Sequence, residues 1–388
     1  MSQFDVIVLG LGAAGSATLY QLARRGAKVL GIDRFSPPHA HGSTHGDTRV
    51  TRLAIGEGEH YTPLAKRSHE IWRELEGATG ASLLTENGGL IMSSGSDEKT
   101  FHGASFFPTT VAAARRHGIA HELLDAGEIH RRFPQFAVDD STRGYFEPSA
   151  GFVRPEACIR AELGQAQQFG ASLRLDEPVQ RIEQLGGTVE VTTAKGRYGA
   201  DRLVVAAGPW LTQLLPELAR HFKVYRQALY WFDVEAHIAD FTPDKFPIFI
   251  WELPGASRGI YGFPAIDGPK GGFKISTEHY LETTTPQTVT RDVTPQEIAA
   301  MYRELVAPHI KGAGVTCVRA VTCLYTVTKD FGFVIDRHPE HDRIIIASPC
   351  SGHGFKHSAA LGEAIGDLAL GEQSRFDLSA FTLARFSK

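Results

Sequence analysis

The sequence predicts a mixed α/β fold, in which a parallel-sheet domain uses both ends of the chain and a mainly antiparallel β-sheet domain is inserted between them. Three observations support this prediction. Residues 5–33 have the pattern strand, helix, strand, and residues 343–370 return to strand and helix. Between these ends, residues 223–280 consist of short aromatic segments separated by turns, which is typical of antiparallel strands.

The first 33 residues predict a βαβ unit. The segment D-V-I-V-L-G (5–10) is short, β-branched and closed by glycine, as a buried strand is. Residues 13–26 carry apolar residues near helical spacing and end at Gly26, and K-V-L-G-I-D (28–33) is a second strand. Two strands joined through a helix run parallel, so this unit begins a parallel sheet.

The remaining elements continue this alternation along the chain. A loop rich in proline, histidine and glycine covers residues 35–48. The elements expected after it are helices near 61–76, 155–169 and 295–308, strands at 179–183, 189–193, 202–208 and 343–348, and a last helix after residue 357.

The length of the chain indicates more than one hydrophobic core. A chain of 388 residues is expected to form two domains or one large composite domain. We assign the first domain to residues 1–80, 150–215 and 325–388. The inserted domain takes residues 81–149 and 216–324.

Composition excludes several classes of protein. A net charge of −4 gives no basic surface for nucleic acid or an anionic membrane, and no apolar run reaches the length of a membrane span. Four cysteines are too few and too scattered for a disulfide scaffold or a zinc site, so no metal is expected. The N-terminus lacks the basic residues of a signal peptide, and the cytoplasm is therefore the expected compartment.

The pattern G-x-G-x-x-G occupies Gly10, Gly12 and Gly15, between the first strand and the first helix. Gly10 allows the tight turn, Gly12 lets a pyrophosphate approach, and Gly15 lets helix and strand pack closely. Asp33 ends the second strand, where an acid can bind the adenosine ribose. These residues predict a Rossmann-like dinucleotide-binding domain, and they leave both NAD and FAD open.

Two later segments add weaker signals for the same domain. V-V-A-A-G-P-W (204–210) is a strand that ends in small residues up to Gly208, as flavoproteins place against the adenosine half of FAD. Val179 is expected to contact the adenine through its backbone.

The segment S-G-H-G-F-K-H (351–357) precedes the last predicted helix. A helix start offers free backbone N–H groups and the positive end of a dipole, which suit an anion or an electron-rich ring. The glycines let such a ligand approach the backbone closely.

Five separate motifs resemble the family of monomeric sarcosine oxidase and N-methyltryptophan oxidase. In chain order they are P-P-H-A-H-G-S-T-H-G-D-T-R-V-T-R (37–52), G-E-G-E-H-Y (56–61), T-C-L-Y-T (322–326), F-V-I-D-R-H-P-E-H (333–341) and S-G-H-G-F-K (351–356). The resemblance covers nearly the whole chain. It implies a monomer with a Rossmann-like FAD-binding domain and an inserted substrate domain, and FAD bound covalently through a cysteine sulfur to the flavin 8α-methyl group.

The resemblance places this covalent bond at Cys323. By its surroundings alone, a cysteine in such a strand is a small buried hydrophobic residue, and Cys317 on a similar strand is the competing candidate. Attachment requires thiolate character, for which Arg49 or His45 could supply the positive charge.

The same resemblance assigns substrate and catalytic residues. Arg52 and Lys356 bind the substrate carboxylate, and the planar guanidinium of arginine allows a bidentate bond. Lys274 lies over the flavin and assists oxygen reduction, while Tyr261 binds the substrate carboxylate or amine. Arg49 lies against the flavin face near His45, and both are placed among the catalytic residues. The further flavin contacts are Arg34, Ser43, Thr48, Arg49, Gly352, His353, Gly354 and Lys356.

The sequence departs from the family pattern at two places. The family carries a histidine four residues after the lysine at 274, where this chain has Glu278, with His279 one residue later. Because a one-residue slip reverses the face of a strand, either a bulge returns His279 to the pocket as a catalytic residue or an acid lines it. Pro349 and Cys350 replace a glycine and a bulky apolar residue, which is expected to shift the loop beside the flavin.

These observations predict an FAD-dependent oxidase of a secondary amine. The reaction is oxidative demethylation of an N-methyl amino acid with molecular oxygen, which gives the amino acid, formaldehyde and hydrogen peroxide. Tyr230, Trp231, Phe249 and Trp251 could form an aromatic pocket for N-methyltryptophan or belong to the core. Sarcosine, pipecolate-type and fructosyl amino acids are alternative substrates. An NAD-dependent dehydrogenase and a non-catalytic FAD-bound protein are the alternatives from other classes.

Overall fold

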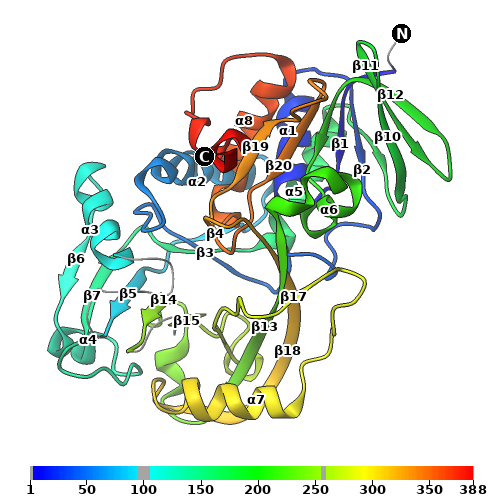
Figure 1. The fold of residues 1–388 in the computed structure, drawn as a ribbon. Coiled ribbons are helices and arrows are strands. Elements are labelled where there is room, and N and C mark those ends of the chain that lie inside the picture. The colour runs from blue at the N-terminus through cyan, green and yellow to red at the C-terminus, as the bar shows by residue number, and fades with distance from the viewer. Residues whose placement is uncertain (1–2, 95–104, 255–258, 388) are drawn as a thin grey trace.

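The computed structural model describes residues 3–94, 105–254 and 259–387 of the 388-residue chain. Within these residues the strands form two large sheets and one small one. The two large sheets lie in opposite halves of the molecule, and the long strands β13 and β18 run side by side in the inserted half and reach toward the other (Figure 1). The predicted fold class is confirmed.

The first large sheet has a parallel centre. Its order is β10-β11-β12-β1-β2-β9, with β20 beside β12 and β19 beside β20. The strands are β1 (Phe4–Leu9), β2 (Val29–Ile32), β9 (Ser172–Arg174), β10 (Val179–Leu185), β11 (Thr188–Thr193), β12 (Arg197–Val205), β19 (Val334–Arg337) and β20 (Ile344–Ser348). β1 runs parallel to β2 and β12, and β12 runs parallel to β20, so both ends of the chain share one sheet.

Four helices pack beside this sheet: α1 (Ala13–Arg24), α2 (Thr62–Thr79), α5 (Pro155–Gln168) and α8 (Ser358–Leu370). α1 contacts both α5 and α8, and every residue from Ala14 to Ala23 is buried, because neighbours cover it on all sides. Small residues allow the close approach of α8: a Cβ atom added to Gly362 would lie 2.6 Å from the Cβ atom of Ala17.

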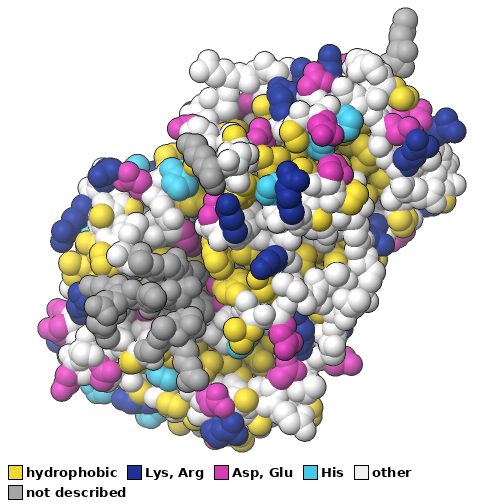
Figure 2. Space-filling model, in the orientation of Figure 1, with side chains coloured by type: hydrophobic (Ala, Val, Ile, Leu, Met, Phe, Trp, Pro, Cys, Tyr) yellow, Lys and Arg dark blue, Asp and Glu magenta, His cyan; other side chains and the backbone are white. Residues whose placement is uncertain are grey.

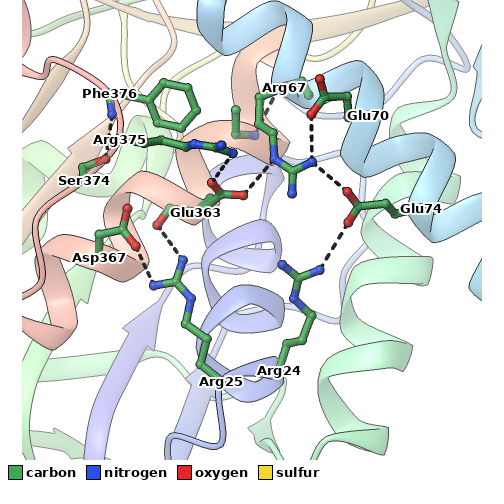
Figure 3. A network of polar contacts seen from close by, with 12 residues as sticks. Arg24, Arg25, Arg67, Glu70, Glu74, Glu363, Asp367, Ser374, Arg375 and Phe376 are labelled. Carbon is green, nitrogen blue, oxygen red and sulfur yellow. Dashed lines mark hydrogen bonds and ion pairs between the residues drawn. The ribbon is translucent and has the colours of Figure 1, made fainter.

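A network of charged side chains ties three of these helices together (Figure 3). Arg67 of α2 donates to Glu70, to Glu74 and, at 3.0 Å, to Glu363 of α8. Arg25 of α1 donates to Asp367 of α8 at 2.6 Å. Networks of several charges contribute more than isolated surface pairs, so we expect this one to stabilise the packing of the helices.

The second large sheet is mostly antiparallel. Its order is β17-β13-β16-β15-β14-β5-β7-β6, with β18 also paired to β13. The strands are β5 (Gly89–Ser93), β6 (Glu122–Leu124), β7 (Arg143–Glu147), β13 (Lys223–Val234), β14 (Ile248–Glu252), β15 (Gly259–Phe263), β16 (Phe273–Ser276), β17 (Thr283–Thr284) and β18 (Ala313–Val327). One pair, β14 with β5, is parallel.

Alternation along these strands separates an aromatic core from the face that carries the site. Tyr230 and Phe232 of β13 pack with Phe249, Trp251 and other residues of one cluster. Leu229 and Trp231 point to the opposite face and pack in another.

Smaller elements complete the described chain. A small sheet joins β3 (Arg49–Thr51) and β4 (Leu84–Thr85) to β8 (Gly151–Val153). The other helices are α3 (Phe106–Arg116), α4 (Ala126–Arg132), α6 (Leu211–Leu214) and α7 (Pro295–Met301). Short 3-10 turns include η1 (Glu59–Tyr61), η2 (Gly208–Trp210) and η7 (Phe355–His357).

The predicted elements are present, with shifted ends. α1 ends at Arg24, and the helix predicted near 295–308 is α7 followed by a π-helical turn over Tyr302–Val306. The 3-10 turn η7 precedes the last helix, which begins at Ser358. Helices α3 and α4 and strands β5 to β7 were not predicted.

Neither a membrane segment nor a metal cluster is found in the part of the chain that the structure describes. None of its helices is both long and apolar enough to cross a bilayer. No three or more His, Cys, Asp or Glu side chains are grouped there so that they could hold a metal ion.

Candidate active site

A crevice of about 360 Å³ opens where the parallel strands β1, β2, β12 and β20 end. Ligands of α/β proteins bind at this edge of a sheet. On the face shown in Figure 2, hydrophobic side chains gather in the middle of the molecule, with Lys and Arg side chains beside them. Ten of the predicted cofactor residues line the crevice: Gly10, Gly12, Asp33, Arg34, Ser43, Arg49, Val179, Gly208, Gly352 and Gly354.

The glycine turn after β1 is held in one conformation. Gly10 has φ +86°, and a Cβ atom added to Gly15 would lie 1.7 Å from the carbonyl oxygen of Gly10, so both positions require glycine. The Asp33 carboxylate accepts hydrogen bonds from the backbone N–H groups of Leu11, at 2.7 Å, and Phe35, at 2.8 Å. A Cβ atom added to Gly12 would meet nothing closer than 3.7 Å, which leaves its face of the turn open to a ligand.

Polar atoms in the crevice suit a polar cofactor such as FAD. Arg34 Nε and Ser348 Oγ are buried, line the crevice and have no hydrogen-bond partner among the described residues. Buried polar atoms are normally satisfied, so these two are available to a bound group. The crevice and its donors therefore fit a dinucleotide.

Lys274 and Arg49 fix the segment 42–49 that forms one wall of the crevice. Lys274 is buried, and its Nζ donates to the carbonyl oxygens of Gly46, at 2.7 Å, and Thr48, at 2.9 Å. Arg49 Nη2 donates to the carbonyl oxygen of Ser43 at 2.7 Å. Burial, together with the charge of Arg49, holds the pKa of Lys274 well below its ordinary value.

His45 lies in the same buried region, where its neutral form is favoured. Burial and the positive charges of Arg49 and Lys274 lower the pKa of His45 to about 3. Its Nε2 atom has no hydrogen-bond partner among the described residues. The lowered pKa of His45 favours Arg49 over His45 as the source of positive charge beside a thiolate.

Cys323 lies fully buried on β18, in a cluster with Trp231 and Tyr325. Tyr325, two residues later, lines the crevice. The residue between them, Leu324, holds the wall segment, because its N–H donates to the Gly42 carbonyl at 3.3 Å and its carbonyl accepts from Ser43 Oγ. Burial raises the pKa of Cys323 to about 11, against the opposing charges of Arg49 and Lys274.

The other two cysteines near this strand differ in their surroundings. Cys317 packs against the aromatic core of the second sheet, and six residues of strand separate it from Cys323 by about 20 Å. Cys350 lines the crevice, and its Sγ atom lies 3.9 Å from Ser43 Oγ.

Arg52 and Lys356 are brought together by Glu57. Arg52 is 1% exposed, and its Nη2 lies 2.6 Å from one carboxylate oxygen of Glu57. Lys356 Nζ lies 3.0 Å from the other oxygen and donates to the carbonyl of His353 at 2.9 Å. Burial lowers the pKa of Lys356 to about 8, although Glu57 opposes the shift. Two buried cations therefore share the carboxylate of Glu57. They lie beside the crevice, because Gly354, two residues before Lys356, lines it.

Tyr261 lies beside these cations. The structure also shows which of Glu278 and His279, the two residues left open after the neighbouring strand β16, enters the site. Tyr261 Oη is 3.4 Å from Tyr325 Oη. Glu278 is buried and faces Tyr261, Tyr325 and Lys356. The backbone of His279 instead pairs with the Gln227 side chain, and its ring lies near Arg226 and Glu297. The structure does not bring His279 into the site, because these contacts hold its backbone and ring on the side of Gln227 and Arg226.

The aromatic residues of the middle segments divide between core and site. Tyr230, Phe249 and Trp251 belong to the aromatic core of the second sheet. Trp231 alone of the four faces the site, where Lys274 Nζ lies 5.3 Å from its ring centre. An aromatic pocket made by all four residues is therefore not formed.

Sequence reasoning missed Glu57, Tyr280 and Tyr325 as members of the site. Glu57 and Tyr325 occur inside motifs that were recognised, so their positions were available as a signal. Glu57 has one near partner, Arg52, but its second partner, Lys356, lies 299 residues away, and the partner of Tyr325 lies on another strand. Only the folded chain shows these contacts.

Comparison with known proteins identifies the family. Residues 5–368 match the family described as FAD dependent oxidoreductase. The chain belongs to this family. FAD, rather than NAD, is therefore the cofactor of this protein.

Relatives of this FAD-dependent oxidoreductase cover nearly its whole length. Monomeric sarcosine oxidase of Streptomyces avermitilis is 40% identical over 370 residues, which is 95% of this chain and 94% of the relative. Monomeric sarcosine oxidase of a Bacillus species is 37% identical, with 99% and 96% covered. N-methyl-L-tryptophan oxidase of Salmonella heidelberg is 33% identical over the full length of both chains. The resemblance predicted from five motifs is confirmed.

Solved structures show the same fold at lower identity. NikD, an unusual amino acid oxidase essential for nikkomycin biosynthesis, superimposes with a TM-score of 0.82 at 24% identity, covering 98% of each chain. Glycine oxidase from Geobacillus kaustophilus gives a TM-score of 0.77 at 21% identity, covering 99% of each chain.

Proposed function

We propose that this FAD-dependent oxidoreductase is an oxidase of secondary amines that demethylates an N-methyl amino acid of the sarcosine or N-methyltryptophan type. The products are the amino acid, formaldehyde and hydrogen peroxide. The names of the relatives support this reaction class. The observation that carries the proposal is the pair of buried cations, Arg52 and Lys356, beside the cofactor crevice.

These two cations are suited to the carboxylate of an amino acid. Glu57 bridges them with its two oxygens, at 2.6 Å and 3.0 Å, which is the arrangement that a bound carboxylate would adopt. A substrate carboxylate therefore competes with Glu57 for the same nitrogen atoms. Tyr261, on β15 beside Tyr325, would hydrogen-bond the substrate at its carboxylate or amine.

The flavin, when bound, takes a hydride equivalent from the substrate and passes its electrons to oxygen. We propose that Cys323 holds it covalently at the 8α-methyl group. Cys323 is favoured over Cys317 because it lies two residues from Tyr325, which lines the crevice, whereas Cys317 faces the aromatic core. Lys274 would lie over the ring and assist oxygen reduction, and Arg49 would lie against its face.

We also propose that the two large sheets correspond to two domains. Residues 1–80, 150–215 and 325–388 would bind FAD, and residues 81–149 and 216–324 would shape the substrate pocket. The strands of each large sheet fall in these ranges, apart from the last three residues of β18.

A substrate panel read by peroxide release tests the reaction. Sarcosine, N-methyltryptophan, pipecolate and a fructosyl amino acid are compared at equal concentration with wild-type protein. We expect the highest kcat/KM with an N-methyl amino acid. A higher value with pipecolate or the fructosyl compound reassigns the substrate, and no peroxide from any of the four refutes the proposal.

Precipitation with acid tests the covalent bond. Wild-type protein and Cys317→Ser are expected to retain their yellow colour in the precipitate, and Cys323→Ser is expected to lose it. Colour lost from Cys317→Ser and retained by Cys323→Ser would overturn the assignment.

A further inference from the structure

Glu278 is an acidic side chain buried beside the groups that we propose to bind substrate. It follows β16, on which side chains alternate, so Glu278 shares the face of Lys274 while Phe273 and Ile275 pack in the aromatic core. Only 9% of its surface is exposed. A carboxyl group in this position is costly to bury, which calls for a specific partner.

The groups around Glu278 come from five parts of the fold. Tyr280 donates its hydroxyl proton to Glu278 Oε2. Tyr261 comes from β15, and Tyr325 and Cys323 come from β18. Glu57 and Lys356 act on it from the segment before η1 and from η7. Among the described residues, Glu278 forms no ion pair within 4.0 Å.

The charges of the pocket leave a place for a zwitterion. Arg52 and Lys356 bring two positive charges, of which Glu57 matches one. Burial raises the pKa of Glu278 to about 8, so its carboxyl group is mostly neutral at pH 7. One unmatched positive charge suits a single substrate carboxylate. The amino group of the same substrate still requires an acceptor, and Glu278 Oε1 accepts no hydrogen bond from the described part of the chain.

We propose that Glu278 is a specificity-determining residue, whose carboxyl group accepts a hydrogen bond from the amino group of the substrate while Arg52 and Lys356 hold its carboxylate. This inference rests on the proposed function and names the substrate class more closely: a compound with an N–H group directly beside a carboxylate. A simple carboxylic acid would use the cations and leave Glu278 without a partner.

Two variants separate recognition of the amine from recognition of the carboxylate. Glu278→Leu keeps the approximate volume and removes the acceptor, and Glu278→Gln keeps one carbonyl oxygen. The KM for sarcosine and the inhibition constant of acetate, which has no amine, are measured by peroxide release. Glu282→Leu, at an exposed neighbouring position, is the matched control, and the FAD content of each variant reports folding.

Glu278→Leu is expected to raise the KM for sarcosine about 10- to 100-fold, the effect of losing a hydrogen bond to a charged group. The acetate constant should stay within about two-fold of wild type, since neither cation is altered. Glu278→Gln should restore part of the sarcosine affinity. The proposal is overturned if both constants rise together or if neither changes.

Failure of the proposed function gives a different result. Wild-type protein that releases no peroxide from any N-methyl amino acid refutes that function. Binding of sarcosine and acetate is then followed through the flavin absorbance of wild type and both variants. Weaker binding of sarcosine by Glu278→Leu, with unchanged binding of acetate, supports the role of Glu278. Unchanged binding of both ligands, or weaker binding of both, refutes it.

Discussion

Replacing Glu162 with glutamine should make the protein less sensitive to alkaline pH. Glu162 is 1% exposed on α5, and its Oε2 lies 2.6 Å from Ser16 Oγ, which is also 2.9 Å from the carbonyl oxygen of Gly12. Ser16 donates its single hydroxyl proton either to Glu162 or to the Gly12 carbonyl, so it compensates a buried charge on Glu162 only in part. Glutamine can donate to Ser16 at every pH.

The structure sets the size of this effect. Burial raises the pKa of Glu162 from 4.5 to about 8, despite the hydrogen bond with Ser16. The stabilisation by the protonated form is fully present below pH 4.5 and is lost as the pH rises through about 8, because the unfolded chain then binds fewer protons. The linkage relation gives a loss of about 2–3 kcal/mol between pH 6 and pH 8.5.

Urea unfolding of the FAD-bound protein measures this loss. The free energy of unfolding is determined at pH 6 and pH 8.5 for wild type, Glu162→Gln and Glu304→Gln, an exposed control. We expect wild type and the control to lose about 2–3 kcal/mol more than Glu162→Gln over this range. An equal loss in all three proteins would refute the assignment of a neutral, buried carboxyl group.

Three further changes have outcomes fixed by local geometry. Gly354→Ala would place a Cβ atom 1.6 Å from the Pro349 carbonyl oxygen, so the loop must shift, and the FAD content per protein should fall well below wild type. Gly77→Ala meets no atom within 4 Å inside α2 and should stabilise the protein by about 1 kcal/mol, seen as a higher Tm. Arg67→Met removes contacts to Glu74 and two other acids and should lower the Tm, by an amount that shrinks in high salt. An unchanged Tm for Arg67→Met at low salt would contradict the stabilising role of its ion pairs. A lower Tm for Gly77→Ala would contradict the predicted gain in helix stability.

The sequence allowed the cofactor half of the site to be predicted because its chemistry is local. Gly10, Gly15 and Asp33 lie within one βαβ unit, and the geometry that requires them is set by that unit alone. The same holds for S-G-H-G-F-K, whose glycines belong to one turn.

The substrate half depends on contacts that no local pattern contains. Whether Glu278 or His279 enters the site depends on the alternation of a strand past its last paired residue, and a single bulge would have reversed the result. Tyr230 and Trp231 are adjacent and equally aromatic, yet one is in the core and the other in the site. Glu57 pairs with Arg52 five residues away, but it bridges two cations only when η7 is brought to the segment before η1.

The choice of partners for the buried cations explains how the site can favour anions. Lys274 and Arg49 are satisfied mainly by backbone carbonyl oxygens, which accept hydrogen bonds but carry no net charge. Arg52 and Lys356 share the single carboxylate of Glu57. Matching each cation with its own carboxylate would cancel the positive potential that a substrate carboxylate and an electron-rich flavin both require. The potential can therefore persist in a buried site because dipoles, rather than counter-charges, satisfy most of its hydrogen bonds.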